Sequence, residues 1–159
     1  MTSREFTFGP FARQAWYRAV NARLVEIAGL EPGQRVVDLA CGPGLITKLI
    51  VEKMRGARES VVIGIDQSAS ALRQGREELA DVGAAVVQFI EGRAEELSQL
   101  VRETVDAVIF CNAIHLVQDK DRVVEEVSHS LRPGGTFAFN TAFFQGTQGV
   151  DTEQFYRRW

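Results

Sequence analysis

The chain has 159 residues, of which 45% are hydrophobic and 25% charged, and its formal net charge is −3. This is the length of a single domain, roughly 100–200 residues, and the slightly acidic balance leaves no electrostatic footprint for nucleic acid. No apolar run approaches the roughly 20 residues of a membrane span or forms a secretory signal. The two cysteines lack metal-ligand spacing, so we expect one cytoplasmic domain, residues 1–159, without a metal site.

Helical and strand-like patterns alternate along the chain. Helical spacing predicts helices over 11–28, 46–54, 69–82, 94–100 and 122–131. Ser68 is the expected N-cap of the third helix, and Asp119 or Asp121 of the last, whose inward residues would be Val123, Val124, Val127 and Leu131. Short β-rich runs predict strands at 35–39, 61–65, 86–90, 105–110 and 136–141, the last after a turn at 132–135.

The alternation of strands and helices decides the fold class. Strands that are apolar on both faces and separated by helices imply a parallel sheet covered on both sides. We therefore expect an open, doubly wound α/β domain whose ligand lies at the carboxyl ends of the strands, beside the first one. Functional residues are accordingly sought just after the strand ends.

The loop after the first strand carries the strongest motif. Asp38 lies within the strand, and Gly42-Pro43-Gly44 follows before a helix begins. Gly-x-Gly alone is equally typical of an ordinary strand-to-helix turn. A dinucleotide fingerprint would have its third glycine where Thr47 stands, and Asp38 would repel a pyrophosphate. The loop therefore disfavours an NAD-dependent oxidoreductase and suits a nucleoside that carries a positive amino group.

The run from Asp38 to Gly44 resembles motif I of class I methyltransferases, and Leu131–Phe139 resembles the family's turn into its fifth strand. The resemblance extends from Leu30 to Asn140. It implies a Rossmann-like sheet in the order 3-2-1-4-5, S-adenosyl-L-methionine as cofactor, and in-line methyl transfer to a small-molecule acceptor. A non-catalytic S-adenosylmethionine-binding domain or fragment is the alternative.

The resemblance also implies roles for individual residues. Asp38 would support the methionyl amino group, and the loop backbone would line the methionyl and ribose portions. Asp66 would hold the ribose hydroxyls, since a ribose-binding acid lies roughly 20 residues after the glycine loop in nucleotide folds. The alternative for Asp66 is a charge at a helix N-terminus. The expected cofactor-binding residues are Tyr17, Asp38, Ala40, Gly42, Gly44, Asp66, Gln67, Arg93, Ala94 and Asn112.

Arg93 departs from the family pattern, which commonly has Asp here to accept a hydrogen bond from the adenine amino group. Arginine donates but cannot accept, so the adenine contact stays open. The backbone N–H of Ala94 is one candidate, and stacking of Arg93 on adenine is another. The other alternative for Arg93 is an ion pair with Glu91 or Glu95.

Two further side chains are candidates for the methionine end of the site. The Tyr17 hydroxyl is expected near the methionyl carboxylate, whereas Phe6, Phe8, Phe11 and Trp16 fit core packing better. His115 is a weak candidate for a general base because its pKa suits neutral pH. A structural role is favoured for it, since it lies among apolar residues.

The end of the sequence carries a last set of expectations. The family continues through strands six and seven, so we expect a shortened domain in which 141–159 begins a substrate-binding insertion. Strand five would then expose an edge, and we expect a homodimer through this edge or the C-terminal tail. Such a chain is expected to bind cofactor poorly and turn over little. Cys41 and Cys111 are expected as free thiols near the cofactor.

Overall fold

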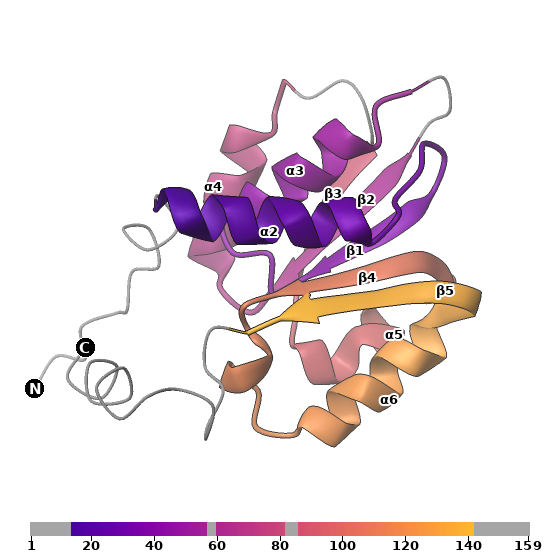
Figure 1. Cartoon of the computed structure of the whole chain (residues 1–159). Helices are drawn as coiled ribbons and strands as arrows, with labels where there is room; N and C mark the ends of the chain where they lie inside the picture. The colour runs from indigo at the N-terminus through magenta and orange to yellow at the C-terminus, as the bar shows by residue number, and fades with distance from the viewer. Residues whose placement is uncertain (1–13, 57–59, 82–85, 142–159) are drawn as a thin grey trace, which may run out of the picture.

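The computed structural model describes residues 14–56, 60–81 and 86–141. Its centre is one sheet of five parallel strands in the order β3-β2-β1-β4-β5 (Figure 1). The strands are β1 (Arg35–Leu39), β2 (Val61–Asp66), β3 (Val86–Glu91), β4 (Val105–Cys111) and β5 (Leu131–Asn140). The predicted fold class and strand order are therefore confirmed.

Helices cover both faces of the sheet (Figure 1). On one face lie α2 (Ala15–Ile27) and α3 (Leu45–Lys53), and α4 (Ala69–Glu78) packs against β2 and β3. On the other face lie α5 (Leu97–Leu100) and α6 (Lys120–Ser130), with the short turns η1 (Ala94–Glu96) and η2 (Ile114–Leu116) after β3 and β4. None of the helices within the described ranges has the length and apolarity needed to cross a bilayer.

The core consists of two apolar clusters, one on each side of the sheet. Successive strand side chains point to opposite faces, so Val36 packs toward α2 and α3 while Val37 packs toward α5 and α6. Both side chains are fully buried. The central strand β1 is thus fixed from both sides, and so is the start of the loop that follows it.

The predicted caps are confirmed, whereas the core packing expected for Trp16 on α2 is wrong, because its side chain is 48% exposed. The Ser68 hydroxyl accepts from the Ala71 N–H at 3.3 Å, and Asp119, rather than Asp121, caps α6 by accepting from the Arg122 N–H at 2.9 Å. The inward predictions for Val124 and Leu131 of this helix are wrong, because Val124 is 48% exposed and Leu131 is the first residue of β5. Glu126 takes the buried position instead, where its carboxylate accepts from the Ser98 N–H of α5 at 2.7 Å.

The fifth strand begins earlier than predicted. Leu131 pairs with Val105 and Thr136 with Ala107, so residues 132–135 form a bulge inside β5 rather than a turn before it. An ion pair between Arg132 and Asp106, with 2.5 Å between Nε and Oδ1, holds this bulge against β4. Among the described strands β5 lies at the edge. Dimerisation through that edge stays a prediction, and the C-terminal tail lies outside the described residues.

Candidate functional site

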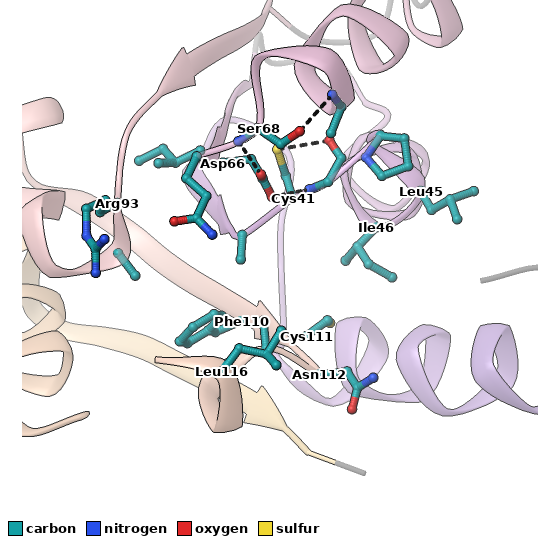
Figure 2. Close-up of a pocket in the computed structure, with 18 of the residues that line it drawn as sticks. Cys41, Leu45, Ile46, Asp66, Ser68, Arg93, Phe110, Cys111, Asn112 and Leu116 are labelled. Atoms are coloured by element: carbon teal, nitrogen blue, oxygen red, sulfur yellow. Dashed lines mark hydrogen bonds between the residues drawn. The ribbon is translucent and has the colours of Figure 1, made fainter. Parts of the chain in front are cut away.

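A cavity of about 670 Å³ lies at the carboxyl ends of the strands (Figure 2). The loops after β1, β2, β3 and β4 line it, together with the first turn of α2 and of α4. Ligand sites for small molecules typically measure about 300–1,000 Å³, and open parallel sheets bind their ligands at this edge. The cavity therefore has the place and the size of a cofactor site.

Eight of the ten expected cofactor-binding residues line this cavity: Tyr17, Ala40, Gly42, Asp66, Gln67, Arg93, Ala94 and Asn112. Three predicted site residues are absent from its wall. Asp38 is 1% exposed within β1, Gly44 lies behind the glycine loop, and His115 lies beyond the end of β4. Figure 2 shows Asp66 and Ser68 on one side of the cavity, and Phe110, Cys111 and Asn112 on the opposite side.

The two glycines of the loop serve different purposes. Both have positive φ, +53° at Gly42 and +84° at Gly44, which glycine adopts without strain. A Cβ added at Gly42 would meet nothing within 4 Å, so the backbone there faces open space in the cavity wall. A Cβ at Gly44 would lie 2.9 Å from Leu79 Cδ1. Gly42 therefore leaves room for a ligand, whereas Gly44 lets α3 and α4 pack closely.

Asp66 joins the end of β2 to the glycine loop. Its Oδ2 accepts from the Gly42 N–H at 2.8 Å, and its Oδ1 accepts from the Ser68 N–H at 2.8 Å (Figure 2). Each carboxylate oxygen accepts more than one hydrogen bond, so both oxygens keep capacity for a ligand. Asp66 thus lines the cavity and also lies two residues before Ser68, the N-cap of α4.

Asp38 and Thr47 form a buried pair beneath the loop. The Thr47 hydroxyl donates to Asp38 Oδ2 at 2.6 Å, and both side chains are almost fully buried. Burial raises the pKa of Asp38 to about 7, with a further increase from Asp66, and Thr47 opposes this rise. From the sequence, Thr47 was notable only because it stands where a dinucleotide fingerprint would have its third glycine. Its role as the hydrogen-bond partner of Asp38 was not predicted.

Arg93 and Glu95 lie side by side in the cavity wall after β3. Arg93 Nη2 is 3.0 Å from Glu95 Oε1, which decides between the two predicted partners in favour of Glu95. The Glu95 side chain is the less exposed of the two, at 16% against 51%. A carboxylate acceptor therefore accompanies the arginine at this end of the cavity.

His115 lies outside the cavity wall, on η2. Its Nδ1 is 3.1 Å from the Thr141 hydroxyl. Burial, and to a lesser extent Lys120, lowers the pKa of this imidazole. This placement favours the structural interpretation over a general base.

Two asparagines that the sequence did not single out are linked by hydrogen bonds to Asn112, which lines the cavity. The Asn112 N–H, at the end of β4, donates to Asn140 Oδ1 at 2.7 Å, and Asn140 Nδ2 donates to Asn21 Oδ1 at 2.8 Å. Asn21 belongs to α2 and is 119 residues from Asn140 in sequence. Only the folded chain brings the two together, so no local pattern could have revealed them.

Cys41 and Cys111 are free, buried thiols that line the cavity, as expected. Burial raises the pKa of both, so little reactive thiolate forms at neutral pH.

We predict that iodoacetamide at pH 8 labels Cys41 and Cys111 at least about tenfold more slowly in the folded chain than in urea, and more slowly still with cofactor present. Equal rates in the two states, or a native disulfide found by mass spectrometry, would contradict this.

Comparison with known proteins agrees with the geometry. A family model described as a methyltransferase domain matches residues 30–154. The ubiquinone/menaquinone biosynthesis C-methyltransferase of Stenotrophomonas maltophilia is 36% identical over 120 residues, which cover 75% of this chain and 46% of that protein. The chain spans about half the length, or less, of the curated relatives it matches, for example 51% of a Legionella pneumophila C-methyltransferase of the same description.

Solved structures share the fold. A chain of the complex between the Haloferax volcanii Trm112 methyltransferase activator and a putative methyltransferase has a TM-score of 0.74 at 22% identity, covering 94% of this chain and 62% of that chain. A SAM-dependent methyltransferase from Aquifex aeolicus has a TM-score of 0.67 at 19% identity, covering 81% and 68%. The chain therefore belongs to the Rossmann-like, S-adenosylmethionine-dependent methyltransferase family.

Proposed function

We propose that the cavity binds S-adenosylmethionine and that the protein transfers its methyl group to a small-molecule acceptor. One observation carries this proposal. The Asp66 carboxylate and the open backbone of Gly42 form one wall of the cavity and are joined by a hydrogen bond of 2.8 Å. A carboxylate that accepts from a vicinal diol beside a backbone without a Cβ suits the ribose of a nucleoside.

The remaining wall suits the two ends of the same ligand. Arg93, Glu95 and the Ala94 backbone offer both donors and an acceptor after β3, where we place the adenine. Ala40 and Gln67 flank the ribose position. Tyr17 and Asn112 lie at the other end, where we place the methionyl group. Asp38, which lies beneath the loop, would support the methionyl amino group of the cofactor.

The bound cofactor would supply a sulfonium methyl group that is already strongly electrophilic. The task of the chain is then to orient the acceptor in line with that group, and orientation alone contributes up to about 7–11 kcal/mol in favourable cases. A dedicated base is not required when the acceptor is itself nucleophilic. The 36% identity to a C-methyltransferase favours a carbon atom of a small acceptor as the methylated position.

The cavity also changes the expectation for binding. The sequence-based expectation is weak cofactor binding. Among the described residues, however, those that line the cavity lie between Tyr17 and Val117. We therefore expect this chain to bind cofactor, while turnover still depends on how the acceptor is held.

Titration calorimetry with S-adenosylmethionine, S-adenosylhomocysteine and NAD tests the proposal. We expect single-site binding of the first two ligands and no heat from NAD. Binding of NAD without a response to the other two would favour the oxidoreductase and overturn the proposal. A chain that binds cofactor but transfers no labelled methyl group to any of a panel of small acceptors would instead favour the non-catalytic alternative.

A further inference from the structure

Three asparagines connect elements that are far apart in sequence at the methionyl end of the cavity. Asn21 lies on α2, Asn112 follows β4, and Asn140 ends β5. The Asn140 side-chain amide contacts both others, because its Oδ1 accepts from the Asn112 N–H at 2.7 Å and its Nδ2 donates to Asn21 Oδ1 at 2.8 Å. Asn21 and Asn112 are 1% and 4% exposed. One side chain thus joins α2 to the end of the sheet.

Tyr17 lies one turn before Asn21 on α2, and residues four apart share a helix face. Tyr17 is only 6% exposed, yet it lines the cavity. Burial raises the pKa of its hydroxyl to about 12, Cys111 adds to this, and the amides of Asn21 and Asn112 act in the opposite direction. Both amides therefore lie beside the Tyr17 oxygen, and the hydroxyl keeps its proton at neutral pH.

The Asn21 amide has a second feature. Within the described part of the chain, its Nδ2 is buried and makes no hydrogen bond of full geometry, although it lies close enough to the Tyr17 oxygen to lower the pKa of that hydroxyl. A buried donor left without a partner is unfavourable, so the amide orientation must come from another contact. That contact is the hydrogen bond that Asn21 Oδ1 receives from Asn140, which turns Nδ2 away from β5.

We propose that Asn140 is a positioning residue, whose side chain fixes α2 through Asn21 and so holds the Tyr17 hydroxyl at the cavity wall as a donor to an anionic group of the ligand. This inference rests on the proposed function and extends it to a residue that does not itself line the cavity. The Asn140 side chain is indispensable only for the link to α2. The contact with Asn112 has a second hydrogen bond, because the Asn112 N–H also donates to the Asn140 backbone oxygen at 3.1 Å. Removing the Asn140 side chain leaves that second tether in place.

A double-mutant cycle on S-adenosylhomocysteine affinity, measured by calorimetry, tests this role. Tyr17→Phe should weaken binding about tenfold or more, as expected for a hydrogen bond to a charged group, and Asn140→Ala should weaken it about threefold to tenfold. In the Tyr17→Phe background, Asn140→Ala should weaken binding by less than about twofold, since the hydroxyl that it positions is gone. Asn21→Ala removes the same link from the α2 side and should show the same dependence on Tyr17, which keeps the test valid if Asn140→Ala folds poorly.

Ser130→Ala is the matched control. It removes a buried side-chain hydrogen bond of 2.9 Å to the Glu126 carbonyl on α6, on the opposite face of the sheet from α2, and should leave affinity unchanged. Unchanged affinity in Asn140→Ala and Asn21→Ala would overturn the inference, as would an equal loss with and without the Tyr17 hydroxyl. Absence of binding by the unaltered chain would overturn the proposed function itself, and this inference with it.

Discussion

Replacing Asp66 with alanine is expected to weaken S-adenosylhomocysteine binding by about 10- to 100-fold. A hydrogen bond to a charged group contributes about 1.5–3 kcal/mol, and Asp66 would accept from both ribose hydroxyls. The substitution also removes the acceptor of the Gly42 and Ser68 N–H groups, which the carboxylate holds at 2.8 Å. The loss therefore combines a missing ligand contact with a less ordered loop. Titration calorimetry measures it directly.

Two further variants separate these contributions. Asp66→Asn keeps the shape and one acceptor oxygen, so its affinity should lie between those of the parent chain and Asp66→Ala. Glu52→Ala removes an exposed acid on α3, away from the cavity wall, and should bind as the parent does. An unchanged dissociation constant for a folded Asp66→Ala protein, with folding checked by urea denaturation, would refute the ribose assignment.

The second large effect is on folding stability, which should depend on pH through Asp38. Burial raises the pKa of this carboxyl from its ordinary 3.8 to about 7 in the folded chain. Between about pH 4 and 7 the folded state therefore keeps a proton that the unfolded state has released. This group's contribution to stability falls as pH rises through that window, by up to about 1.4 kcal/mol per pH unit, and is constant above it.

Asp38→Asn should remove this slope, because an amide does not titrate and its oxygen still accepts from the Thr47 hydroxyl. Urea denaturation at several values between pH 4.5 and 8 should show the variant gaining stability relative to the parent as pH rises. Thr47→Val is the complementary variant. It removes a contact that lowers the Asp38 pKa, so it should extend the sloping window to higher pH. Parallel stability profiles for parent and Asp38→Asn would contradict the assignment.

Local sequence patterns predicted the fold well because the fold depends on local preferences. The central strands β1, β2 and β4 have the apolar, β-branched composition that packs on both faces of a parallel sheet, and Ser68 and Asp119 cap their helices as expected. The errors occurred where tertiary contacts decide. Glu126 rather than Val124 is buried on α6, and the Ser98 N–H of α5 supplies the Glu126 carboxylate with a partner. Asp106 binds Arg132 and so holds the extra residues 132–135 within β5.

The candidate site likewise contains residues that the sequence predicted and residues that it did not. Residues directly after strand ends were predictable, since the topology brings those ends together, and Gly42, Asp66 and Ala94 do line one cavity. The partners of those residues were not predictable. Thr47 beneath Asp38, and Asn140 between α2 and β4, depend on distances that only the folded chain determines. Both are side chains that orient other side chains, and no spacing rule identifies such residues.

A crystal structure of the chain with S-adenosylhomocysteine would show directly whether the cavity at the carboxyl ends of the strands is the cofactor site. We expect both ribose hydroxyls within hydrogen-bonding distance of the Asp66 carboxylate, with the ligand passing close to Gly42. The adenine should lie beside Arg93 and the homocysteine carboxylate beside Tyr17. A ligand bound elsewhere, or one whose ribose does not contact Asp66, would contradict this assignment.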